Sequence, residues 1–194
     1  MPDRLSNPVA PRYSAAMTAH HTRLLALLSA IVAAAALRLV PHPPNFSPID
    51  AMALFSGAYL GRRSLAFVAP LAALLLSDLI LGFYAGMAFV YASVALVVLI
   101  GWWVSSRSTA LHIGAGALAG SISFFLITNF GMWLFSGFYP LTSAGLAACF
   151  VAAIPFFQNT VAGDLFYTIL LFGGFALLER AVPAVRLARA PRAA

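Results

Sequence analysis

Seven apolar runs, separated by short polar or proline-containing segments, dominate this sequence. Five of the runs have 17 or more residues, which is about the length that an α-helix needs to cross the hydrocarbon core of a bilayer. The composition agrees, because 62% of the 194 residues are hydrophobic and only 8% are charged, whereas about a quarter of the residues in a soluble domain are charged. A soluble globular domain is therefore excluded.

The runs predict an all-α fold, a polytopic membrane bundle of six transmembrane helices with a short second helix. Residues 144–157 are too short to span comfortably and end at Pro155, so we expect a re-entrant or surface helix there. The bundle would form one domain, 24–180, between a disordered cytoplasmic tail, 1–23, and a cytoplasmic C-terminal tail, 181–194. Met17 is an alternative to Met1 as the start of translation. The predicted spans are Leu24–Val40, Ile49–Leu60, Leu65–Tyr84, Ala88–Val104, Leu111–Phe135 and Thr160–Leu178.

All eleven basic residues are arginines, and their positions orient the bundle. Cytoplasmic segments collect arginine and lysine, and six spans with both termini inside place ten of the eleven on that side. Arg38 is the exception, at the outer end of the first run. The predicted topology thus explains the basic net charge, and binding to nucleic acid is not needed to explain it. An alternative for the first run is a signal peptide cleaved near Ala33–Ala36.

Several polar side chains fall in the outer half of the predicted helices or in the proline-rich segment after the first one. An ionisable group inside a membrane costs a few kcal/mol and usually faces the bundle interior or water. We therefore predict a polar pocket, open to the outside, that binds a small molecule. Two alternatives remain: Asp50 could only cap its helix, and Arg38 could only form a structural ion pair. The candidate binding residues are Arg38, His42, Asn45, Asp50, Asp78, Asn129, Asn159 and Asp164.

Two further patterns concern metals and partners. The single cysteine, Cys149, excludes a disulfide framework and a cysteine-based metal site, and we expect neither a metal nor a cofactor. Ala26, Ala30 and Ala34 form a stripe of small residues at four-residue spacing. Such stripes let helices approach closely in lipid, so this one either packs inside the bundle or faces another protein.

Four segments, 38–49, 76–79, 128–131 and 159–164, together with the predicted topology, resemble an uncharacterised bacterial family of transport proteins with a domain of unknown function. That family is related to the substrate-binding S components of energy-coupling-factor (ECF) vitamin transporters. The resemblance covers about residues 24–180. It implies residence in the bacterial inner membrane, capture of a vitamin or similar micronutrient, and docking through the alanine stripe to an ECF transmembrane subunit with two ATPases.

The leading prediction is therefore an uptake component that binds its substrate and is not an enzyme. An intramembrane aspartyl protease is a second hypothesis, with Asp78 and Asp164 as a dyad on two helices. Gly163-Asp164 matches the end of the Gly-x-Gly-Asp signature of such enzymes, but Val161 replaces its first glycine. A purely structural membrane protein is the third hypothesis. An outer cavity would favour binding, and a filled core would favour the structural role.

Overall fold

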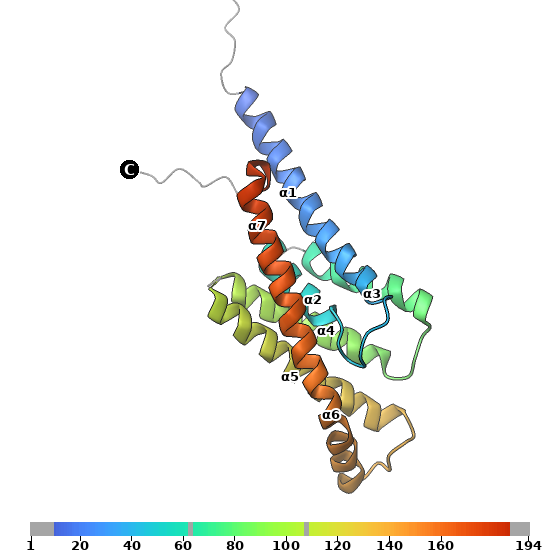
Figure 1. Cartoon of the computed structure of the whole chain (residues 1–194). Coiled ribbons are helices and arrows are strands. Elements are labelled where there is room, and N and C mark those ends of the chain that lie inside the picture. The colour runs from blue at the N-terminus through green and yellow to red at the C-terminus, as the bar shows by residue number, and fades with distance from the viewer. Residues whose placement is uncertain (1–9, 62–63, 107–108, 187–194) are drawn as a thin grey trace, which may run out of the picture.

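The structure, a computed structural model, describes residues 10–61, 64–106 and 109–186, with side chains from residue 17 onward. All regular elements in these residues are helical (Figure 1), which confirms the all-α prediction for this part of the chain. The elements are α1 (Ala10–Leu37), α2 (Ile49–Leu60), α3 (Leu65–Leu81), α4 (Met87–Ser105), α5 (Ala110–Phe135), α6 (Ser143–Thr168), the π-helix η1 (Ile169–Gly173), α7 (Gly174–Ala181) and the 3₁₀ turn η2 (Pro183–Val185).

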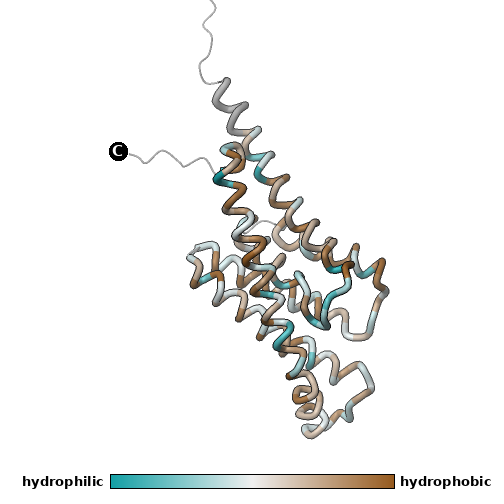
Figure 2. Tube along the Cα trace, in the orientation of Figure 1, coloured by the Kyte–Doolittle hydropathy of each residue, from teal (hydrophilic) through white to brown (hydrophobic). Residues whose placement is uncertain are grey.

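Four helical stretches among the described residues are long and apolar enough to cross a membrane: Met17–Leu37, α4, α5 and the continuous helix Ser143–Ala181. The other two apolar helices, α2 and α3, are shorter. Large hydrophobic side chains such as Leu76, Ile80 and Ile169 are exposed on the outside of the bundle, and apolar residues run along most of its helices (Figure 2). These features indicate a helical membrane protein, because lipid is the solvent in which such surfaces are stable.

The short helix α2 forms the centre of the bundle. It contacts α1, α3, α4, α5 and α6, and ten of its twelve residues are buried. Small residues make this possible, since a Cβ atom added to Gly57 would overlap the backbone carbonyl of Val98 in α4, and one added to Gly101 would overlap that of Leu54. The helices α2 and α4 therefore cross with their backbones in direct contact, as glycines allow in membrane bundles.

The last two apolar runs form one continuous helix, so the prediction of a separate re-entrant or surface helix at 144–157 is wrong. The helix covers 39 residues, Ser143–Ala181, and is about 58 Å long. Pro155 lies inside it. A membrane helix tolerates such a proline when its surroundings satisfy the freed backbone group. The π-helical turn η1 interrupts the regular geometry nearer the C-terminal end.

The predicted N-terminal tail is also corrected in part. The helix α1 begins at Ala10, so residues 10–23 continue the first apolar helix as additional turns. Residues 1–9 and 187–194 lie outside the described residues. The same holds for these arginines that the topology assigned to the cytoplasm: Arg4, Arg62, Arg63, Arg107, Arg189 and Arg192.

One ion pair joins the first and the last α-helix of the described chain. Arg23 in α1 pairs with Glu179 in α7 and donates to the carbonyl of Val185 at 2.7 Å. Its guanidinium also lies over the rings of Tyr59 and Phe175, 5.7 and 5.1 Å from their centroids. We call this group the Arg23 latch. It joins the middle of α1 to the end of α7, and the first turns of α1 extend beyond this contact (Figure 1).

Candidate functional site

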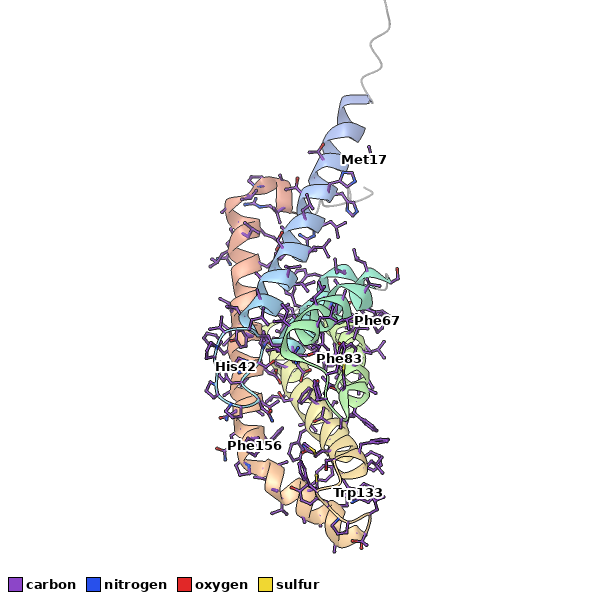
Figure 3. The ribbon with its side chains drawn as sticks, turned by 90° about the vertical axis from the view of Figure 1, so that its right-hand side faces the viewer. Met17, His42, Phe67, Phe83, Trp133 and Phe156 are labelled. Carbon is purple, nitrogen blue, oxygen red and sulfur yellow. The ribbon has the colours of Figure 1, made fainter. Side chains whose placement is uncertain are left out.

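The proline-rich loop between α1 and α2 lies against α6. The side-chain amide of Asn159 donates to the carbonyl of Pro44 at 3.0 Å, and the Phe46 ring contacts those of Phe166 and Tyr167. Gly163 allows this approach, because a Cβ atom there would come within 3.0 Å of the Phe46 Cα. Figure 3 shows the loop beside the long helix, with His42 labelled on it.

A cavity of about 360 Å³ opens beneath this loop. Its wall comes from the loop, from the start of α2, from the segment between α3 and α4, from the start of α4, and from the C-terminal halves of α5 and α6. A volume of this size falls within the range of small-molecule sites in proteins. The lining residues are Arg38, His42, Asn45, Ser47, Ile49, Asp50, Tyr84, Ala85, Gly86, Val90, Phe124, Thr128, Asn129, Met132, Thr160 and Asp164.

Two carboxyl groups share one side of the cavity. Asp50 lies in the first turn of α2 and is 5% exposed, and Asp164 lies in α6 and is 2% exposed. They are close enough to interact electrostatically. Asp164 accepts a hydrogen bond from Ser121, but Oδ1 of Asp50 has no hydrogen-bond partner in the described part of the chain. Asp50 lies in the first turn of α2, where the helix dipole favours a negative charge, but the dipole supplies no hydrogen-bond partner for its Oδ1.

A second charged group lies at the edge of the cavity. Arg38 pairs with Asp78 in α3 and donates to Ser77 at 2.5 Å. The other carboxylate oxygen of Asp78 accepts from the Tyr91 hydroxyl at 2.9 Å. Asp78 is fully buried and does not line the cavity. Arg38 thus faces the cavity with its charge already neutralised.

Six of the eight candidate binding residues line the cavity, all except Asp78 and Asn159. Asp78 holds Arg38, and Asn159 holds the loop. Their side chains therefore support the wall from behind. The side-chain nitrogen of Asn129 donates to the carbonyl of Phe125 in its own helix, and the backbone carbonyl of Asn129 accepts from the Cys149 thiol.

Several contributors were missed from the sequence. Ser121 bonds Asp164, Tyr91 bonds Asp78, and Tyr84 and Phe124 bring aromatic rings to the wall. Hydroxyls and rings are common in membrane helices, where they often bond to their own backbone or face lipid. Their position in the sequence therefore gave no signal, and only the packing of helices reveals their role.

The alanine stripe faces the chain's own helices. Ala34 is 3% exposed, and Ala26 and Ala30 pack against the hydrophobic core. The exposed side of α1 carries larger residues such as Leu25 and Val32. Internal packing accounts for the side of the stripe that faces the bundle, and its predicted role as a docking face for another subunit stays a prediction.

Substituting Asn159 by alanine should loosen the loop without disturbing the bundle. The hydrogen bond to Pro44 would be lost, and a hydrogen bond of this kind contributes about 1 kcal/mol. We expect amide hydrogen exchange at Phe46 to rise about fivefold, measured by mass spectrometry in detergent micelles. The matched control is Asn129→Ala, whose amide bonds only within α5 and which should leave exchange in the loop unchanged. Equal exchange in both variants would contradict this role of Asn159.

The fold and the site define a class: a helical membrane protein with a polar cavity enclosed by its own helices. Residues 18–185 match the model of a family of unknown function, DUF6580, and the chain belongs to that family. No curated protein and no solved structure shows a significant match to it. The function of this family is unknown, so the cavity is the feature from which a function can be inferred.

Proposed function

We propose that this protein is the substrate-binding component of a micronutrient uptake system and holds a small molecule in the cavity. One observation carries the proposal: a cavity of about 360 Å³ inside the bundle, with a buried carboxyl oxygen that has no partner of its own. A buried polar atom without a partner costs about 1–3 kcal/mol, and a ligand could supply that partner. A core filled by side chains would have favoured a purely structural role instead.

The proposed orientation places both termini in the cytoplasm of a bacterium and the cavity at the outer face of its inner membrane. The arginine distribution supports it. The loops that line the cavity support it too, because Arg38–Ile49 and Tyr84–Gly86 are connections that the arginine pattern assigns to the outer side. The Arg23 latch then lies at the cytoplasmic end.

The proposed energy source is a separate transmembrane subunit with two ATPases, as the resemblance to S components implies. The sequence supports the need for other proteins, since it contains no GxxxxGKS/T phosphate-binding loop. Because the alanine stripe packs internally, the proposal assigns this contact to another, lipid-facing part of the bundle.

Binding accounts for the two carboxyl groups of the second hypothesis better than catalysis does. An aspartyl dyad needs two carboxyl groups that share a proton at one reacting centre. Here Asp78 has both oxygens engaged, by Arg38 and Tyr91, and does not reach the cavity. Asp164 is held by Ser121. We therefore propose a binding protein without enzyme activity.

A substitution that fills the cavity tests the proposal. Thr128 lines the cavity from α5, so Thr128→Trp should occupy it and abolish ligand binding. The full-length protein is purified in mild detergent, and small molecules released on denaturation are identified by mass spectrometry. We expect wild type to release a compound in about equimolar amount and Thr128→Trp to release none.

The matched control is Ile122→Trp, on the half-exposed side of the same helix. This variant should retain the compound, because its indole would face lipid. Retention by Thr128→Trp, or the absence of any compound from wild type together with no stabilisation by added small molecules, would contradict the proposed function.

A further inference from the structure

We propose that the cavity takes a small organic cation, with its ammonium group placed between the carboxyl groups of Asp50 and Asp164. This inference rests on the proposed binding function and names the chemical class of its ligand. It follows from the charges that face the cavity, from the unpartnered oxygen of Asp50, and from the size and composition of the wall.

The charges facing the cavity do not balance. The lining includes Arg38, His42, Asp50 and Asp164. Arg38 is neutralised by Asp78 from outside the lining, and the ring of His42 contacts the carbonyl of Pro43. The two carboxyl groups line the same cavity, and neither has a basic partner in the described residues. A ligand with a positive charge would be attracted to these carboxyl groups, whereas an anionic ligand would be repelled by an ionised carboxylate.

The carboxyl group of Asp50 has an oxygen that can accept a hydrogen bond from a ligand. The side chain is 5% exposed, and its Oδ1 accepts no hydrogen bond in the described part of the chain. Buried charges in membrane proteins are paired, and an unpaired one marks a functional position. An ammonium group offers both the positive charge and the N–H donor that Asp50 lacks. Asp164, held in place by Ser121, would provide the second contact.

The wall favours an organic cation over a metal ion. The rings of Tyr84 and Phe124 line the cavity, and aromatic faces attract organic cations within a desolvated site. Among the described residues, no group of three or more histidine, cysteine, aspartate or glutamate side chains could hold a metal. A bare ion would also leave most of the 360 Å³ unfilled.

The test uses aromatic probes of similar size that differ in charge, with sodium as the inorganic cation. The full-length protein in detergent micelles is titrated with benzylammonium, phenethylammonium, benzyl alcohol, benzoate and sodium ions, and the shift in melting temperature and the Kd are measured. We expect the two ammonium probes to stabilise wild type and the neutral and anionic probes to do so much less. In Asp50→Asn and Asp164→Asn, affinity for the ammonium probes should fall about tenfold or more.

Both asparagine substitutions keep the shape of the side chain, so the variants should fold, and circular dichroism checks this. Glu179→Gln is the matched control, because it removes one negative charge at the opposite end of the molecule. This variant should keep its affinity for the ammonium probes, even where the Arg23 latch weakens.

The remaining outcomes separate this inference from the proposed function. Stabilisation by benzyl alcohol or benzoate that survives both asparagine substitutions would overturn the inference that the ligand is a cation, but it would leave the proposed binding function intact. A co-purifying neutral or anionic compound would have the same consequence. A sodium-dependent shift that requires both aspartates would replace the organic ligand with an inorganic ion. A co-purifying cation that both variants lose would support the inference even if the probes bind weakly. Absence of any bound compound and of any probe effect would overturn both.

Discussion

Asp78→Asn should destabilise the protein by about 3–5 kcal/mol, the effect expected when one partner of a buried ion pair is removed. Asp78 is fully buried, and the Arg38 side chain that it neutralises is only 12% exposed. The neutral amide would leave the guanidinium charge without a counter-charge inside the bundle. Thermal unfolding in detergent micelles, followed by circular dichroism, measures the loss.

A double variant is the control for this prediction. Arg38→Met combined with Asp78→Leu removes both charges and keeps similar volumes, and replacing a buried pair by apolar residues is often neutral or stabilising. We expect the double variant to regain most of the stability that Asp78→Asn loses. If the Asp78→Asn variant unfolds at the wild-type temperature, water solvates the Arg38 guanidinium and the ion pair between Arg38 and Asp78 does not contribute to stability.

Gly57→Ala should destabilise the crossing of α2 and α4 by about 3 kcal/mol, at the upper end of the range for overpacked cores. The added methyl group would overlap the carbonyl of Val98 and lie 3.0 Å from the Cα of Gly101. Both obstacles are backbone atoms, so neither can turn aside as a side chain would. Because α2 contacts most of the other helices, the displacement would spread through the bundle.

Gly114→Ala is the matched control. Gly114 lies inside α5, and a Cβ atom there meets nothing within 4 Å. Alanine favours a helix over glycine by about 0.5–1 kcal/mol, so this variant should unfold at or above the wild-type temperature. Equal effects of the two substitutions would show that the close contact at Gly57 does not determine stability.

The apolar runs predicted most helix bounds because hydrophobicity and helix formation coincide in lipid. The prediction for α2, Ile49–Leu60, agrees with the structure at both ends, where Pro48 and Gly61 border the apolar run. The error at 144–157 came from the shortness of this apolar run and from reading Pro155 as the end of a helix. In the structure, the helix continues through Pro155 and Asn159, and Asn159 faces the loop.

The sequence predicted the level in the bundle at which the site residues lie, but not the direction in which their side chains point. Topology alone placed the polar residues at one level of the bundle, and six of the eight candidates line the cavity. Which way each side chain points depends on how the helices pack, and the sequence carries no such information. Asp78 therefore seemed equivalent to Asp164, although the first is closed off by Arg38 and the second opens to the cavity.

The continuous helix Ser143–Ala181 joins two parts of the molecule mechanically. It carries Asp164 at the cavity and Glu179 in the Arg23 latch, about 22 Å apart along the helix axis. A helix is stiff along its length, so a tilt imposed at the cavity reaches the latch as a displacement of Glu179 unless the π-helical turn η1 between them absorbs it. Bending at η1 would therefore uncouple the cavity from the Arg23 latch, whereas a straight helix would transmit the tilt between them.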